Sequence, residues 1–347
     1  MMRCGLARPC GRGDPQDPPP GFAGSPPNAH FVRWGEKHPP RRLRRHSPQR
    51  SFHSLGGETP PGAKRRWGRW PEGPGGGEDR AAPTLIYHRF VPTVASFVST
   101  LAERTRPEYA ASWDPVGLQL GDPAAQADSV AVCHEVTEEV VSALEKEPVD
   151  LLVTYHPLLF EPVNRILAGR SPSARAFRLL AAGVNLVVSH TDFDAAPGGT
   201  ADALASLLRL RDTVPFGADE AEGLPAIGRV GLFEATLGDL EARITDTLGS
   251  NGLRVSGDRE ASLERVAVVP GSGSGLIGEA ATIADALVTG DVSHHRVIQA
   301  LDLGLSIVDP GHIATERPGM AALVALVADA AGGRIVDLTD LDPETWT

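Results

Sequence analysis

Residues 129–157 read SVAVCHEVTEEVVSALEKEPVDLLVTYHP and contain the repeating unit of this chain. The first and last parts are β-branched apolar runs that predict strands, and the part between them predicts a helix. A strand, a helix and a second strand in this order predict a βαβ unit with a right-handed crossover. Units of this kind are typical of α/β folds.

The same alternation continues on either side of this unit. Residues 91–105 predict an amphipathic helix, and residues 112–123 predict an irregular connection. Further along, SARAFRLLAAG at 173–183 predicts a helix, VNLVVSH at 184–190 a strand, and GGTADALASLLRL at 198–210 another helix.

A second alternating block occupies residues 263–347. It follows a less regular stretch, 212–262, that is expected to contain small antiparallel and helical pieces. The last helix is predicted to start after Thr315, which is a good N-cap residue. Pro318 would then fall in the first turn, where a missing N–H group costs nothing.

These patterns predict an α/β protein with two similar halves, residues 83–211 and 263–347, joined by the connecting segment 212–262. Each half would hold a mixed or parallel sheet flanked by helices. Open α/β sheets bind ligands beyond the carboxyl ends of their strands. A metal site is therefore expected in the cleft between the two halves.

Residues 1–82 are predicted to be a disordered Pro/Gly/Arg-rich extension. They contain 14 of the 30 prolines and show no apolar periodicity, so they cannot bury enough surface to offset the entropy of ordering. Their arginines and tryptophans leave a nucleic-acid tail, a membrane-surface tail or an organelle transit peptide as alternatives. We prefer an unselected or misassigned N-terminal extension, so deletion of residues 1–82 should leave folding and metal content intact.

The body of the chain is acidic. Residues 1–80 carry 15 Lys and Arg against 7 Asp and Glu, which leaves 18 against 37 in residues 81–347. This charge argues against nucleic-acid binding through a broad basic face. The three cysteines, Cys4, Cys10 and Cys133, form no disulfide or CxxC pattern, which favours the reducing cytoplasm. No apolar run approaches the roughly 18 residues that a membrane span requires.

Three segments end in residues that bind divalent metals: TYHPLLFEPVNRI around His156, VVSHTDFDAAPGG around Asp194, and VDPGHIATERPG around His312 and Glu316. Each follows a predicted strand, so the side chains should emerge at strand ends. Imidazole and carboxylate together suit Zn, Fe or Mn. His156 alone could equally be a buried structural histidine, and Glu316 could merely favour a helix N-terminus.

Further histidines could carry protons near neutral pH. His295, which opens a predicted helix after Ser293, and His190, in a turn, are the candidates. Asp192 is expected to serve the turn rather than a metal. Gly273, Gly275 and Gly278 match GxGxxG, but the turn is too long and lacks the acidic partner of a dinucleotide site. A phosphate-binding helix terminus remains open there, whereas GxSxG and GKS or GKT motifs are absent.

Together, four segments resemble the NIF-three-like (YbgI) family of dinuclear metal centre proteins, which are GTP cyclohydrolase type-2 homologues. SWDPVGLQLGD is similar to the family's W-D-N-x-G-L opening, with Pro115 where Asn is usual. YHPLLFEPVNRI is similar to its H-H-P segment, SHTDFDAAPGG to H-T-N-x-D-A-A-P-G-G, and TGDVSHH…VDPGH…TE to T-G-D…G-H…E. The resemblance runs from about Val91 to Leu338.

The resemblance implies metal ligation by His156, Asp194, His312 and Glu316, with one or two ions of Zn, Fe or Mn per subunit. It also implies a homohexamer, and it places His190 and His295 in the same cavity. Tyr155 departs from the pattern, because many members have a histidine there. A neutral phenol, with an ordinary pKa near ~10, is a poor ligand, so one metal position could be weak or empty.

These observations predict a cytoplasmic metal-dependent hydrolase in which a metal-activated water attacks a small-molecule substrate. The substrate could be a nucleotide such as GTP. Glu316, with His295 or His190 as the proton carrier, would be the catalytic group. The alternative is a non-enzymic metal-binding scaffold or regulatory interaction protein, and a nucleotide-dependent oxidoreductase is disfavoured.

Overall fold

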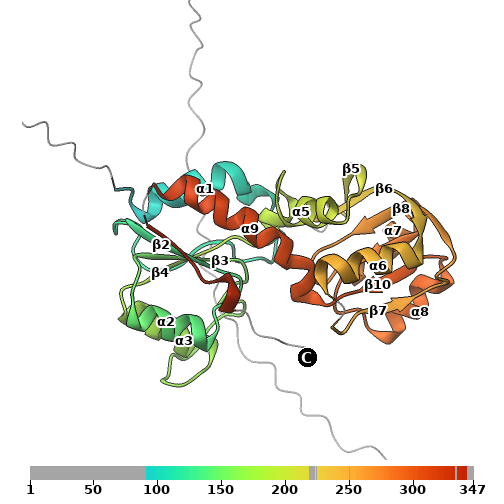
Figure 1. Ribbon diagram of the computed structural model, residues 1–347. Helices are drawn as coiled ribbons and strands as arrows, with labels where there is room; N and C mark the ends of the chain where they lie inside the picture. The colour runs from blue at the N-terminus through green and yellow to red at the C-terminus, as the bar shows by residue number, and fades with distance from the viewer. Residues whose placement is uncertain (1–90, 219–222, 224, 250, 333, 342–347) are drawn as a thin grey trace, which may run out of the picture. The chain divides into compact units, whose positions relative to one another are not determined.

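The computed structural model describes residues 91–218, 223, 225–249, 251–332 and 334–341. The predicted disordered extension, residues 1–82, lies outside these residues and stays a prediction. Within the described part, the chain forms two sheets flanked by helices, as predicted for a mixed α/β fold (Figure 1). None of the helices in this part has the length and apolarity needed to cross a membrane.

The first sheet has the strand order β1-β4-β3-β2-β11. Strands β2, β3, β4 and β11 are parallel neighbours, whereas β1 pairs antiparallel with β4. Its strands are β1 (Gly117–Leu120), β2 (Ser129–Cys133), β3 (Leu151–Thr154), β4 (Asn185–Val188) and β11 (Arg334–Asp337).

Helices cover both faces of the first sheet. Val130 and Val132 of β2 face the cluster built with α1 (Val94–Thr105) and α9 (His312–Ala331). Ala131 and Cys133 of the same strand face the opposite cluster, built with helices α2 (Glu138–Lys146) and α3 (Pro172–Ala181). Both sets are buried because successive strand residues point to opposite faces. This explains the continuous apolar runs in the sequence.

The second sheet has the order β5-β6-β8-β9-β10-β7, with β8, β9 and β10 parallel. One face packs against α5 and α6 and the other against α7 and α8. The strands are β5 (Arg211–Phe216), β6 (Gly228–Thr236), β7 (Arg254–Ser256), β8 (Ser262–Val268), β9 (Ala286–Val288) and β10 (Ser306–Asp309). The helices are α4 (Thr191–Ala195), α5 (Thr200–Leu207), α6 (Leu237–Leu248), α7 (Ile277–Ile283) and α8 (His294–Asp302).

Helix α9 connects the two sheets. It begins directly after β10 of the second sheet, packs its buried Leu323 and Val327 into the core of the first, and leads into β11, which pairs with β2. Figure 1 shows this path from the second sheet to the first. The chain therefore ends its described part in the first sheet. The four-part division of the chain at residues 82, 211 and 262 stays a prediction.

The start of α9 corrects one expectation. The helix begins at His312, with Gly311 at its N-cap position, and not after Thr315. The Thr315 hydroxyl lies inside the first turn, where it accepts a hydrogen bond from the Gly271 N–H and donates to the His312 carbonyl. Pro318 consequently lies within the helix.

The four strands that the sequence did not reveal are the edge strands of the two sheets. These are β1, β11, β5 and β7. Five of the six residues of β5 are exposed, and β7 and β11 have no fully buried residue. Edge strands bury less surface, so they lack the apolar runs that identified the central strands.

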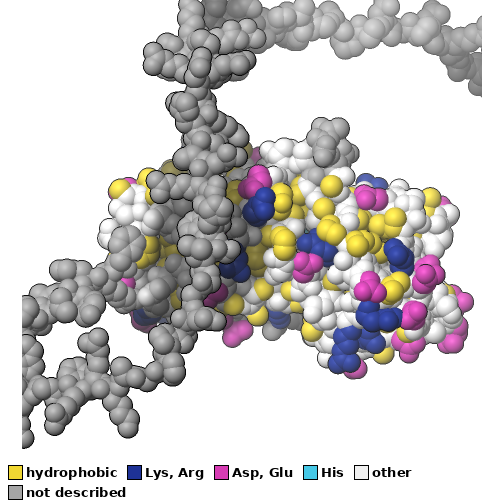
Figure 2. Space-filling view, turned by 90° about the horizontal axis from the view of Figure 1, so that it is seen from above, with side chains coloured by type: hydrophobic (Ala, Val, Ile, Leu, Met, Phe, Trp, Pro, Cys, Tyr) yellow, Lys and Arg dark blue, Asp and Glu magenta, His cyan; other side chains and the backbone are white. Residues whose placement is uncertain are grey.

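On the face seen in Figure 2, Asp and Glu side chains lie among Lys, Arg and hydrophobic side chains. The described residues of this face therefore form no broad basic patch. The expectation that nucleic acid is not a partner remains a prediction.

Gly319 permits the close packing of α9 on α5, and its substitution should destabilise the fold. A Cβ atom at Gly319 would lie 2.8 Å from the Thr200 Cα atom. We expect Gly319→Ala to lower the free energy of unfolding by about 1–3 kcal/mol, as overpacked cores do. Urea denaturation followed by circular dichroism measures this change.

Gly278 provides the matched control. It lies in α7 with no heavy atom within 4 Å of a Cβ built there. Gly278→Ala should leave stability unchanged or raise it by up to about 1 kcal/mol. Equal effects of the two alanines would contradict the packing argument.

Candidate metal centre

Strand ends of both sheets bring four side chains together. His134 directly follows β2 and His156 lies two residues beyond β3 in the first sheet. His312 opens α9 just after β10 of the second sheet, and Glu316 lies one turn further along that helix. Parallel strands present their carboxyl ends at one edge, which is where α/β proteins place ligands.

The Glu316 carboxylate is the centre of this group. Its Oε2 atom lies 2.8 Å from His134 Nε2 and 3.3 Å from His156 Nε2. Its Oε1 atom lies 3.0 Å from His312 Nε2, across one helical turn. The carboxylate is almost fully buried, with 3% of its side chain exposed. Three imidazoles thus surround one buried acid.

His134, His156 and Glu316 fit a metal ion. Each offers one ligand atom, and the three atoms lie within 4.8 Å of one another. Two imidazoles and one carboxylate are a donor set that zinc and non-haem iron use in proteins. Close by, a Cβ atom at Gly271 would lie 2.5 Å from Glu316 Oε1, so the absence of a side chain there leaves room beside the carboxylate.

The imidazoles determine the charge of Glu316. Burial alone would raise its pKa, but hydrogen bonds with His134, His156 and His312 outweigh burial and hold the pKa well below its usual value. Burial likewise opposes the charged form of His312, yet its bonds to Glu316 and Asp291 raise its pKa to about 9. The site therefore favours an ionised Glu316 carboxylate next to a cationic His312.

Tyr155 and Asp194 form a second buried pair beside this group. The Tyr155 hydroxyl donates to Asp194 Oδ1 at 2.5 Å, and both side chains are buried. Burial raises the pKa of Tyr155 well above its ordinary value and that of Asp194 to about 7. The Tyr155 ring lies 5.2–5.3 Å, centroid to centroid, from the rings of His134, His156 and His190.

His190 is held by Asp114, which the sequence reasoning did not single out. His190 Nδ1 lies 3.0 Å from Asp114 Oδ2, the oxygen that also accepts from the Thr191 backbone and hydroxyl. Burial opposes charge on both groups, but their mutual contact raises the pKa of His190 and lowers that of Asp114. The neighbouring Asp192 accepts from the His190 N–H at 2.7 Å, which is the turn role expected of it.

The remaining predicted site residue, His295, lies in helix α8 of the second sheet and not among the residues around Glu316. It is exposed at the start of α8, and its ring lies 5.5 Å from that of His294. No contact joins it to the Glu316 group within the described residues. Ser293 occupies the N-cap position of α8 without a side-chain hydrogen bond. The role of His295 as a proton carrier remains a prediction.

Of the predicted ligands, the structure brings His156, His312 and Glu316 into direct contact. Asp194 instead contacts Tyr155, although the charge of Glu316 contributes to the raised pKa of Asp194. His134 was missed. Like His156, it comes directly after a β-branched run, in SVAVCH, so the pattern that selected His156 could have selected His134 as well.

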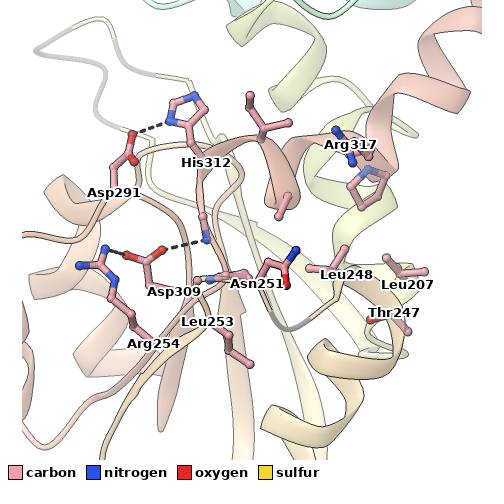
Figure 3. A pocket seen from close by; sticks show the side chains of 16 residues that line it. Leu207, Thr247, Leu248, Asn251, Leu253, Arg254, Asp291, Asp309, His312 and Arg317 are labelled. Atoms are coloured by element: carbon pink, nitrogen blue, oxygen red, sulfur yellow. Dashed lines mark hydrogen bonds and ion pairs between the residues drawn. The ribbon is translucent and has the colours of Figure 1, made fainter. Parts of the chain in front are cut away.

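A cavity of about 830 Å³ opens next to the site, on the side of the second sheet. Figure 3 shows His312 and its partner Asp291 in its lining, with Arg254 paired to Asp309 below them and Arg317 further along α9. His312 Nδ1 lies 2.7 Å from Asp291 Oδ2. The volume falls in the range of small-molecule binding pockets.

The glycine run Gly273, Gly275 and Gly278 follows strand β8 of the second sheet and leads into α7. Gly273 donates its N–H to the Thr289 hydroxyl, and a Cβ atom there would lie 2.5 Å from Val269 Cβ. Gly271 donates to Thr315 and accepts from Gly290. These two glycines therefore serve close packing of the turn against β9 and α9.

Residues 92–339 match the sequence profile of Duf34/NIF3 (NGG1p interacting factor 3). The chain therefore belongs to the Duf34/NIF3 family. This confirms the resemblance seen in the four sequence segments. Curated relatives include the "GTP cyclohydrolase 1 type 2 homolog" of Streptomyces coelicolor, 33% identical over 74% of this chain and 94% of that protein. The protein of the same name from Clostridium perfringens is 31% identical over 59% and 80%.

Solved structures of other proteins share the fold. Reduced HcgD from Methanocaldococcus jannaschii matches with a TM-score of 0.63 and 27% identity, covering 72% of this chain and 98% of that one. A Bacillus cereus protein related to NIF3 matches with a TM-score of 0.65 and 21% identity, covering 74% and 98%. The second match shows the fold alone.

The raised pKa of His312 predicts a pH dependence of stability. Protonated His312 stabilises the folded state, because its pKa rises from the ordinary 6.5 to about 9 on folding. This contribution is complete below pH 6.5 and is lost as the pH rises to about 9. The melting temperature of the metal-free protein, measured in a chelator, should therefore fall over this range less steeply in His312→Gln than in the wild type.

The exposed His294 supplies a control. His294→Gln should retain the wild-type slope, since His294 contacts only the His295 ring among the contacts of the described residues. Parallel curves for the wild type and His312→Gln would contradict the ion pairs assigned to His312.

Proposed function

We propose that this Duf34/NIF3 protein is a metal-dependent hydrolase. The observation that supports the proposal best is the buried Glu316 carboxylate, whose oxygen lies within 3.3 Å of imidazole nitrogens from two neighbouring strand ends. His134, His156 and Glu316 would hold a Zn, Fe or Mn ion. When bound, such an ion lowers the pKa of a coordinated water to about 7 and polarises the substrate.

His312 and His190 would flank the reacting atoms. Asp291 fixes the His312 ring through Nδ1, and Asp114 fixes the His190 ring in the same way. The Nε2 atom of His312 faces the Glu316 carboxylate at 3.0 Å, and the His190 ring lies 5.5 Å from the His156 ring. Both imidazoles could accept or donate a proton there. His190 is the better proton carrier of the two predicted candidates, because His295 has no contact with this group among the described residues.

The substrate would be a small molecule, and the names of the relatives suggest GTP. The adjacent cavity is large enough for a nucleotide. Trp113, with 54% of its surface exposed, lies 6.4 Å from the His190 ring and 5.7 Å from the Phe160 ring. These aromatic side chains do not line that cavity, but beside His190 they offer a stacking surface for a planar ring. Hydrolytic opening of the GTP imidazole ring would leave a formamide, and hydrolysis of that formamide by a second water would release formate.

Glu316→Gln tests the hydrolase proposal. The substitution keeps the volume but removes the negative charge that the three imidazoles surround. Since loss of a mere outer partner costs about 10–100-fold in metal affinity, loss of this ligand should weaken binding more than about 100-fold. Turnover of GTP, measured as formate release, should disappear with it.

Glu161→Gln is the matched control, because Glu161 is an exposed carboxylate. It should retain metal and activity. If metal-loaded wild-type protein leaves GTP intact, the assignment of GTP is wrong. If no other nucleotide or ring substrate is hydrolysed, the hydrolase proposal is wrong as well.

The alternative function is a non-enzymic metal-binding scaffold or regulatory interaction protein. The contact of Tyr155 with Asp194 favours it, because this contact withdraws one predicted ligand from the centre. Under this alternative, Glu316→Gln would lose metal without losing partner binding.

We further propose that the protein is a homohexamer and is located in the cytoplasm. The mass of the purified protein in solution tests the oligomeric state.

A further inference from the structure

We propose that Tyr155 restricts this centre to a single metal ion, held by His134, His156 and Glu316, by occupying the position that a second ion would need beside Asp194. The inference rests on the metal-binding part of the proposed function. The inference goes beyond the proposed function because it assigns the number of ions, and because it gives a role to Tyr155, which is not itself a ligand.

The donors near the site fall into two sets. His134, His156 and Glu316 have ligand atoms within 4.8 Å of one another. Asp194 and His190 form the other set, and the pKa of each responds to the charge of the other. A second ion would have to use the Asp194 carboxylate. This carboxylate is the acid of the second set, and it is buried in contact with Tyr155.

Tyr155 stands between the two sets. Its side chain is fully buried, and its ring lies 5.3 Å from the His134 ring, 5.2 Å from the His156 ring and 5.2 Å from the His190 ring. Its hydroxyl donates to Asp194 Oδ1. An ion at this oxygen would have to displace the hydrogen bond and shift a fully buried ring, which a closely packed interior opposes.

His134 provides the imidazole that Tyr155 does not. Tyr155 and His134 follow neighbouring parallel strands, and the Tyr155 N–H donates to the carbonyl of Cys133, the residue before His134. His134 Nε2 lies closer to Glu316 Oε2, at 2.8 Å, than His156 Nε2 does, at 3.3 Å. The first ion therefore has a complete donor set without Tyr155 or Asp194.

Two substitutions separate this arrangement from one in which Asp194 is a ligand. Asp194→Asn preserves the shape and an oxygen that can accept from the Tyr155 hydroxyl, and should change the affinity for Zn²⁺ less than about 3-fold. His134→Ala removes a ligand and should weaken Zn²⁺ binding more than about 100-fold, beyond the 10–100-fold typical of outer partners. Calorimetric titration of the metal-free full-length protein with Zn²⁺ measures both.

The number of ions provides the second readout. Elemental analysis should find one ion per chain in wild-type protein, and a Mn²⁺-loaded sample should give the electron paramagnetic resonance spectrum of isolated ions. Tyr155→His should raise the number to two, with a coupled spectrum, and Tyr155→His with Asp194→Asn should return it to one. The wild-type count and the Asp194→Asn titration decide the matter even if Tyr155→His does not fold.

The outcomes distinguish the two proposals. Two ions per chain in the wild type, or a large loss of affinity in Asp194→Asn, would overturn the role of Tyr155 and leave the hydrolase proposal standing. No bound ion at all would overturn both. One ion, lost in His134→Ala and retained in Asp194→Asn, supports the inference.

Discussion

The structure depends on how the negative charge of Glu316 is accommodated inside the protein. Transfer of a carboxylate from water to the interior costs several kcal/mol unless it is paired and hydrogen-bonded. Here three imidazole nitrogens lie within 3.3 Å of its two oxygens. Two of these rings belong to the first sheet, and the third precedes the acid on its own helix. The charge is therefore stabilised only when α9 is seated on the first sheet.

The turns of the second sheet fit the start of the same helix. Gly271 donates to the Thr315 hydroxyl, and the Gly290 N–H donates to the Gly271 carbonyl. A Cβ atom at Gly290 would lie 2.5 Å from the His312 nitrogen, so a larger residue would push the first turn of α9 away. The glycine backbone of the second sheet's turns packs closely against the start of α9, and the buried Glu316 carboxylate pairs with imidazoles of the first sheet. These two sets of contacts together fix the position of His312 and Glu316. This fixed geometry would suit the proposed binding of a metal ion.

Much of this arrangement was accessible from the sequence, for identifiable reasons. Central strands carry continuous apolar runs, and a histidine directly after such a run must emerge at the sheet edge. His156, His312 and Glu316 were found in this way. The edge strands were not, because they are half exposed and lack that signal. Asp114 was also out of reach, since its contact with His190 spans 76 residues and follows from the packing of an irregular segment.

His134 and Asp194 show where reasoning from one segment at a time fails. His134 has the same local signature as His156, but only the adjacency of β2 and β3 reveals that both rings reach the same carboxylate. Asp194 follows a strand end, yet its carboxylate accepts a hydrogen bond from Tyr155 and does not contact Glu316 in the described contacts. A sequence motif predicts which residue types could bind a metal. Which of these side chains meet at one position can be seen only from their neighbours in the folded structure.

The return of the chain to its first sheet has a consequence for synthesis on the ribosome. Strand β2 obtains its outer neighbour only from β11, and the hydrophobic face beneath α1 is completed only by α9. The nascent polypeptide thus exposes an unpaired edge of β2 and a hydrophobic surface until residues 312–337 have left the exit tunnel. Surfaces of this kind are prone to aggregation while they are exposed, and chaperones shield them.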